Sequence, residues 1–199
     1  ELYEEILKVY PNNPETNFLL GSLSLDTNNL GKAKFFLEKT IKIKPNNSHA
    51  QNNLGTVYSE IGEIHKAKKC YEKAIEIEPS LAEAHSNLGK KFKELGELKE
   101  AINCFQNALK YKSESLLYYF YLSELQKNFL DTKLKNKIET ITKTNNSTKN
   151  DIIYGNFLLS RYEKKKKNYK KELDYLEKGH HHQFESKKKI YINEVNQWL

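Results

Sequence analysis

Two asparagine side chains, Asn53 and Asn87, are the groups in this sequence best suited to hold another molecule. A side-chain amide offers hydrogen-bond donors and an acceptor, so a row of amides can grip the backbone of an extended peptide without reading its side chains. The two residues lie 34 positions apart, and Leu19 and Tyr121 stand one interval before and after them. The spacing therefore predicts an amide row with two members.

Residues that could carry catalysis or bind a metal do not occur in a usable pattern. The sequence has no glycine-rich phosphate loop, nucleophile elbow, H-E-x-x-H motif or Cys–His pair. His180, His181 and His182 are consecutive, and consecutive side chains on a helix point about 100° apart, so the three rings share one metal ion poorly. We predict no catalytic residue, no metal and no cofactor, and therefore not an enzyme.

Basic residues exceed acidic ones, 33 to 26, and the formal net charge is +7. Such an excess can indicate a nucleic-acid partner. However, Arg161 is the only arginine, and arginine is the usual residue for bidentate phosphate or base contacts. The run Lys164–Lys167, followed by Lys170 and Lys171, is typical of a solvated turn, with attraction of an acidic partner as the alternative. We predict no nucleic-acid binding.

The elements that position the asparagines repeat with the same interval. Five small residues, Gly55, Gly62, Ala67, Cys70 and Ala74, recur as Gly89, Gly96, Ala101, Cys104 and Ala108. A period of about 34 residues marks a stack of helix–turn–helix units, each of which buries its apolar face only against its neighbours. We predict an all-α fold, a right-handed α-solenoid of antiparallel helix pairs.

The residue order within one interval is specific. Residues 54–79 read L-G-x-x-Y, then G, then A-x-x-x-Y-x-x-A, then P, and this order resembles the tetratricopeptide repeat (TPR) family. In the preceding interval Asn28 replaces the turn glycine, which asparagine tolerates because it can adopt positive φ. The resemblance implies a TPR superhelix. Its parts would be the second half of a truncated repeat at 1–13 and full repeats at 14–47, 48–81 and 82–115.

The pattern weakens after residue 115. Residues 116–149 predict a degenerate hairpin, in which Ser123 replaces the glycine of the first helix. Residues 150–183 predict a further TPR-like hairpin. Apolar residues at helical spacing follow in 184–199, where we predict a C-terminal capping helix, with continuation of the preceding helix as the alternative.

Part of the last hairpin carries a narrower resemblance. Phe157, Leu159, Tyr169, Tyr175 and the run 176–179 resemble the last repeats of bacterial proteins in which a TPR array precedes a sulfotransferase domain, although Lys167 stands in place of the usual turn glycine. The chain also begins within a repeat and contains no methionine, and a large aromatic residue, Trp198, lies next to its end. We therefore expect a fragment of a longer protein.

The TPR resemblance also implies where a partner binds. In such arrays the first helix of each repeat lines a concave groove, and residues 84–88 resemble the repeats of the O-linked N-acetylglucosamine transferase, whose array uses an asparagine row. Bases that a chaperone-tail clamp needs are missing, since Phe18, Glu83 and Leu117 stand at such places, so we predict against a receptor for chaperone tails. The predicted groove residues are His49, Asn52, Asn53, Thr56, Ser86, Asn87, Lys90, Lys93 and Glu124.

These observations predict a binding protein. Cys70 and Cys104 occupy equivalent packing positions, so we expect reduced core cysteines. No apolar run approaches the roughly 20 residues of a membrane span, and no signal peptide is visible; we expect a cytoplasmic location.

Two functions follow from this sequence, with no oligomeric state indicated. The first is a non-catalytic scaffold that recruits a protein or an extended peptide through the groove of a TPR array. The alternative is the N-terminal TPR arm of a larger enzyme, a sulfotransferase or glycosyltransferase, whose catalytic domain lies outside this chain.

Overall fold

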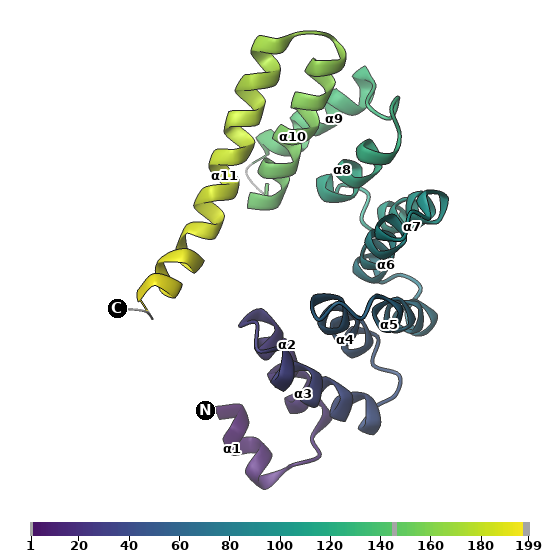
Figure 1. Ribbon diagram of the computed structural model, residues 1–199, viewed down its shortest axis with the longest axis vertical. Helices are drawn as coiled ribbons and strands as arrows, with labels where there is room; N and C mark the ends of the chain where they lie inside the picture. Colours follow the sequence, from purple (N-terminus) through teal and green to yellow (C-terminus); the bar gives the residue numbers. More distant parts are fainter. Residues whose placement is uncertain (1, 145–146, 197–199) are drawn as a thin grey trace. The chain divides into compact units, whose positions relative to one another are not determined.

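The computed structural model describes the backbone of residues 2–144 and 147–196 and the side chains of residues 5–185, residues 7, 145 and 146 excepted. Throughout these residues the regular structure is α-helical (Figure 1), in agreement with the predicted fold class. The chain divides into two units, Glu1–Tyr111 and Lys112–Leu199, and each is described separately.

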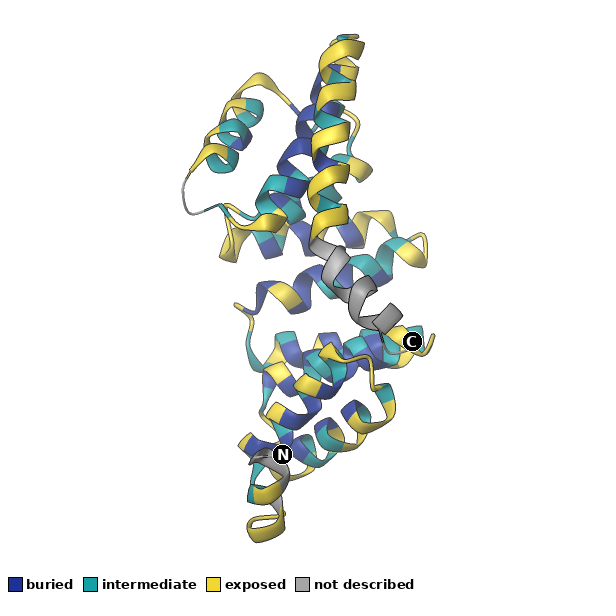
Figure 2. Ribbon diagram, turned by 90° about the vertical axis from the view of Figure 1, so that its left-hand side faces the viewer, coloured by how far each residue is buried: buried dark blue, intermediate teal, exposed yellow. Residues whose placement is uncertain are grey.

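Helix pairs build the first unit. α2 pairs with α3, α4 with α5 and α6 with α7, and each pair contacts the next through its second helix. The helices are α1 (Leu2–Val9), α2 (Pro14–Asp26), α3 (Leu30–Ile43), α4 (Ser48–Glu60), α5 (Ile64–Ile77), α6 (Ala82–Glu94) and α7 (Leu98–Tyr111). The faces where helices meet are buried and the outward faces are exposed (Figure 2).

Close approach of the two helices in a pair depends on glycine in the first helix. A Cβ on Gly55 would lie 2.7 Å from the Tyr71 ring, and one on Gly89 would lie 2.9 Å from the Phe105 ring. Both rings are almost fully buried, so they fill the space that a side chain would take. The predicted small packing residues are fully buried as well: Ala67, Ala74, Ala101 and Ala108.

The turns within the pairs require a left-handed backbone. Gly62 and Gly96 have φ values of 81° and 78°, and Asn28 takes the same role with φ 57°, which confirms the predicted replacement. Lys167 occupies this place in the turn after α10 with φ 58°. Lysine pays a steric cost in this region that glycine does not.

Short polar side chains begin many of the helices. Asn13, Asn29 and Asn47 each accept a hydrogen bond from a backbone N–H in the first turn of α2, α3 and α4. Asp131 caps α9 in the same way, and Thr148 forms a capping box with Asp151 at α10. These side chains satisfy N–H groups that have no partner within the helix.

The second unit is organised around α10. Its helices are α8 (Leu116–Leu125), α9 (Thr132–Lys143), α10 (Lys149–Lys165) and α11 (Tyr169–Asn196). α10 packs against α8, α9 and α11, whereas α8 and α9 make little contact with each other. The predicted hairpin over 116–149 therefore consists of two helices whose main partner is α10. The core residues are Leu116, Leu130, Ile138, Leu158, Leu159 and Tyr162.

α11 runs from Tyr169 to Asn196 without a break. Residues 184–196 thus continue the second helix of the last pair. The sequence predicts this continuation as the alternative to a separate capping helix. The side chains beyond residue 185, Trp198 among them, lie outside the described residues, so a capping role for this segment stays a prediction.

Candidate functional site

A chain of amide hydrogen bonds connects α2, α4 and α6, which lie on one side of the first unit (Figure 1). We call this side the first-helix face. Asn87 Nδ2 donates to Asn52 Oδ1 and Asn53 Nδ2 donates to Ser22 Oγ, both at 3.0 Å. Within α4, Asn52 Nδ2 donates to Asn53 Oδ1 at 3.4 Å. The two predicted amides are thus oriented by neighbours on adjacent helices.

Burial divides the predicted groove residues. Asn52 and Ser86 are each 4% exposed, so they lie beneath the surface that the sequence predicts they line, because α4 and α6 meet there. His49 is exposed, and its Nε2 lies 3.9 Å from Glu78 Oε2. The remaining predicted residues of this unit are half-buried: Asn53, Thr56, Asn87, Lys90 and Lys93.

Two adjacent lysines on α6 have different surroundings. Lys91 is 7% exposed, and its Nζ donates to Ser59 Oγ and to both carboxylate oxygens of Glu94, each at 2.7 Å. Among the described residues, the Lys90 ammonium has no hydrogen-bond or ion-pair partner. Burial, and next the positive charge of Lys91, lowers the pKa of Lys90 below the ordinary lysine value, while the charges of Glu94 and Glu60 oppose this shift from a distance.

This arrangement can hold an anion beside a peptide backbone. A desolvated cation interacts with an anion more strongly than a solvated one does, and the amides of Asn53 and Asn87 offer neutral donors. Lys91 was not among the predicted groove residues, although its helical spacing to Asn87 and Glu94 places the three on one face. Only the structure shows that Lys91, and not Lys90, takes the Glu94 carboxylate.

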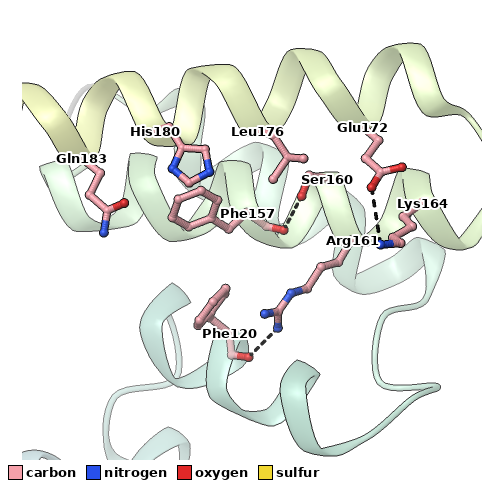
Figure 3. Close-up of a pocket in the computed structure, with 9 residues that line it drawn as sticks. All are labelled: Phe120, Phe157, Ser160, Arg161, Lys164, Glu172, Leu176, His180 and Gln183. Atoms are coloured by element: carbon pink, nitrogen blue, oxygen red, sulfur yellow. Dashed lines mark hydrogen bonds and ion pairs between the residues drawn. The ribbon is translucent and has the colours of Figure 1, made fainter.

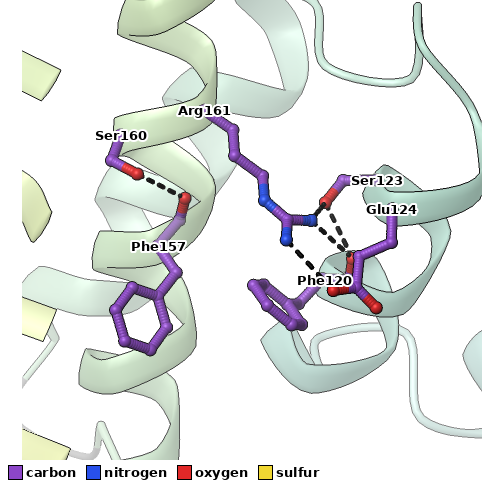
Figure 4. A network of polar contacts seen from close by, with 6 residues as sticks. All are labelled: Phe120, Ser123, Glu124, Phe157, Ser160 and Arg161. Carbon is purple, nitrogen blue, oxygen red and sulfur yellow. Dashed lines mark hydrogen bonds and ion pairs between the residues drawn. The ribbon is translucent and has the colours of Figure 1, made fainter. Parts of the chain in front are cut away.

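Glu124, the ninth predicted groove residue, belongs to the second unit. Its Oε1 accepts from Arg161 Nη2 at 3.1 Å (Figure 4). Arg161 Nη1 donates to Ser123 Oγ at 2.7 Å and to the Phe120 carbonyl at 3.4 Å, and the guanidinium lies 4.1 Å from the centre of the Phe120 ring. Arg161 therefore joins α10 to α8 at the residue where serine replaces glycine.

A pocket of about 430 Å³ lies beside this network (Figure 3). Phe120, Phe157 and Leu176 supply its apolar wall. Arg161, Lys164, Glu172, His180 and Gln183 supply polar groups. The Phe120 and Phe157 rings are 6.0 Å apart, and the His180 ring lies 5.1 Å from Phe157 in an edge-on arrangement.

Known proteins resemble the chain over its repeats. Sequence profiles described as "Tetratricopeptide repeat" match residues 14–47, 49–81 and 82–115, together about half of the chain. The chain belongs to the tetratricopeptide repeat family. No curated protein sequence matches significantly. The matched segments end at residue 115, so the narrower sulfotransferase-associated resemblance of residues 157–179 stays a prediction.

Solved TPR structures share the fold of this TPR chain. The crystal structure of MamA is 24% identical in sequence and has a TM-score of 0.60. The match covers 83% of this chain and 87% of the MamA chain. YrrB, described as a TPR protein with an unusual peptide-binding site, is 18% identical and has a TM-score of 0.60. The match covers 92% of this chain and 93% of the YrrB chain. The Arabidopsis OM64 TPR domain is 23% identical and has a TM-score of 0.55. The match covers 58% of this chain and 95% of the OM64 domain. These likenesses show the fold alone; family membership supports a protein- or peptide-binding scaffold in general.

The cysteines of this TPR chain are not set up for redox or nucleophilic chemistry. Cys70 and Cys104 are free thiols, and burial raises the pKa of each to about 11, so little thiolate exists at neutral pH. Among the described residues, no three His, Cys, Asp or Glu side chains cluster in a way that would hold a metal ion. No described helix is both long and apolar enough to span a membrane.

Proposed function

We propose that the first-helix face binds an extended, acidic peptide segment of a partner protein, and that the chain acts as a non-catalytic scaffold. The observation that carries this proposal is Lys90, a desolvated ammonium without a hydrogen-bond or ion-pair partner among the described residues. It lies on the same helix as Asn87, whose amide is held in place by Asn52. TPR-family membership supports a peptide or protein as the ligand.

The amides retain capacity for a peptide. Each side-chain amide nitrogen carries two N–H groups. Asn87 uses one on Asn52, and Asn53 uses one on Ser22. The second N–H of each can donate to a peptide carbonyl, so the two asparagines would hold the backbone while Lys90 takes an Asp or Glu side chain. The peptide would need one Asp or Glu side chain, and its other residues could vary.

A peptide library tests this assignment. Peptides selected from a random library on the full chain should be enriched in Asp or Glu. Lys90→Met should weaken their binding about tenfold, since a hydrogen bond to a charged group is worth roughly 1.5–3 kcal/mol. The matched control is Lys99→Met on the exposed side of α7, which should leave affinity unchanged. Peptides without acidic residues, or equal loss in both variants, would contradict the proposal.

The alternative function, an arm of a sulfotransferase or glycosyltransferase, rests on the resemblance of residues 157–179. In the structure, those residues serve packing: a Cβ on Gly179 would lie 2.7 Å from the Phe157 ring, and Leu159 is 3% exposed. They favour a well-packed α10–α11 pair and no particular chemistry. The reading frame beyond Leu199 tests this alternative, because a strand–loop–helix phosphate site there would support it and further repeats would argue against it.

A further inference from the structure

The net positive charge of the chain comes from one of its two units. Residues 1–111 contain equal numbers of acidic and basic side chains, so the whole net charge of +7 belongs to residues 112–199. The lysines of the α10–α11 turn, Lys164–Lys167, are all exposed. An uneven charge of this size raises the local concentration of anionic partners at the second unit and accelerates their association.

The pocket of the second unit lies directly beside that turn. Lys164 lines it, with a side chain 71% exposed, and its Nζ is 3.8 Å from Glu172 Oε1 (Figure 3). At that distance the ion pair is loose and solvated, and it leaves the ammonium accessible. The pocket volume, about 430 Å³, falls in the range of sites that take a small ligand or a single side chain.

The apolar surface continues from the pocket along α11. Tyr169 and Leu173 lie seven residues before the pocket residues Leu176 and His180, and therefore on the same helix face. Phe184 lies one turn beyond His180. Tyr169, Leu173 and Phe184 are 66%, 57% and 59% exposed. Exposed apolar groups gathered around a pocket mark a surface for a partner.

We propose that this pocket binds an acidic peptide segment that carries an aromatic side chain. The aromatic ring would pack on Phe120, Phe157 and Leu176, and the neighbouring carboxylates would face Lys164 and the lysine turn. This site is separate from the first-helix face and does not rest on the function proposed for that face.

The surrounding charges favour an acidic peptide over a nucleic acid. Arg161, the side chain best suited to phosphate, already donates to Glu124, Ser123 and the Phe120 carbonyl. The Glu172 carboxylate lines the pocket and would repel a phosphate placed there, whereas the proposed peptide puts an uncharged ring in the pocket and its carboxylates outside it, at the lysine turn. A second copy of the same unit would bring a like charge to the surface, so it is also a poorer occupant.

The test uses the full chain with Lys90→Met, which removes the cation of the first-helix face, and a labelled peptide, Asp-Glu-Phe-Glu-Asp, followed by fluorescence anisotropy. Replacing its Phe by Ala should weaken binding by about tenfold or more, the effect of losing one buried aromatic side chain. His180→Glu adds a carboxylate at the pocket and should weaken binding strongly. His181→Glu is the matched control, because this neighbouring residue is also exposed, carries the same change and does not line the pocket.

Each other outcome overturns the proposal. Equal binding of the Phe and Ala peptides would mean charge attraction alone, and equal loss in the two histidine variants would mean that the pocket is not the site. Displacement of the peptide by an oligonucleotide or by anionic vesicles at lower concentration would assign the surface to those partners. Self-association of the chain that blocks the peptide would assign it to a second copy. Because every titration uses the Lys90→Met background, binding at the first-helix face does not account for these results, and the two proposals are tested separately.

Discussion

At the scale of single residues, the first-helix face depends on Asn52. Asn52 is 4% exposed, and its side-chain oxygen accepts a hydrogen bond from Asn87 on the neighbouring helix. A buried acceptor that loses its donor is costly, whereas an exposed amide contributes little. The amides of this face therefore combine a structural role with the proposed binding role.

We expect Asn87→Ala to lower the free energy of unfolding by about 1–2 kcal/mol, because it leaves the buried Asn52 oxygen without its donor. Asn103→Ala is the matched control on the exposed side of α7 and should change stability by less than about 0.5 kcal/mol. Urea denaturation measures both values. Equal small effects would show that the Asn87–Asn52 bond contributes nothing to folding.

We expect peptide affinity at the first-helix face to fall with rising pH, and to do so before an ordinary lysine loses its proton. Burial lowers the pKa of Lys90, so its proton is lost at a lower pH than that of an ordinary lysine. A bound carboxylate favours the protonated form, and binding therefore weakens as pH rises through the lowered pKa. The free protein has the opposite trend, since charging a buried Lys90 opposes folding below that pKa.

Titration of a selected acidic peptide at several pH values measures this dependence. Lys90→Arg keeps the charge at all accessible pH values and should remove the decline. A decline that persists unchanged in the arginine variant would assign it to another group.

At the scale of helices, glycine controls how closely a pair packs. Gly55→Ala should destabilise the first unit by about 1–3 kcal/mol, because the added Cβ would lie 2.7 Å from the buried Tyr71 ring. Gly31→Ala, in α3, meets nothing within 4 Å and should stabilise slightly through helix propensity. Thermal unfolding should show a lower melting temperature for Gly55→Ala and a slightly higher one for Gly31→Ala. A higher melting temperature for Gly55→Ala would mean that this helix contact is loose.

The turn between α10 and α11 offers a second test at this scale. Lys167→Gly should stabilise the second unit by about 1 kcal/mol, since lysine is strained at φ 58° and glycine is not. Lys166→Gly, at φ −84°, relieves no strain and should be neutral or destabilising. Chemical denaturation compares the two, and a gain in both variants would point to removal of lysine charge as the cause.

At the scale of the molecule, the chain combines a neutral unit of regular repeats with a basic unit of irregular ones. Repeat arrays gain stability from interfaces between neighbours, and about three repeats suffice. Residues 1–111 contain three complete helix pairs. We expect this fragment to be helical and to unfold cooperatively, as measured by circular dichroism on heating. A gradual, non-cooperative loss of helix would show that the first unit needs the second to fold.

Sequence alone determined the repeat fold, because its signals are local and periodic. A glycine that faces a ring, such as Gly55, and a residue that adopts positive φ, such as Asn28, recur at a spacing that only stacked helix pairs explain. The same spacing placed Asn53 and Asn87 on the side where α4 and α6 lie. After residue 115 the spacing fades. There the sequence predicts a hairpin over 116–149, whereas α8 and α9 each pack mainly on α10.

Tertiary structure decided which polar groups pair with one another. Repeat spacing does not distinguish Lys90 from Lys91, yet the rotation of α6 gives the hydrogen bonds of the Glu94 carboxylate to Lys91 and leaves Lys90 only a longer-range attraction to it. Likewise, Glu124 fits the groove pattern in the sequence, but packing of α8 on α10 pairs it with Arg161. Hydrogen bonds and ion pairs join atoms a few ångströms apart on residues that are distant in sequence. A repeat register that is correct to one residue therefore does not determine which groups pair.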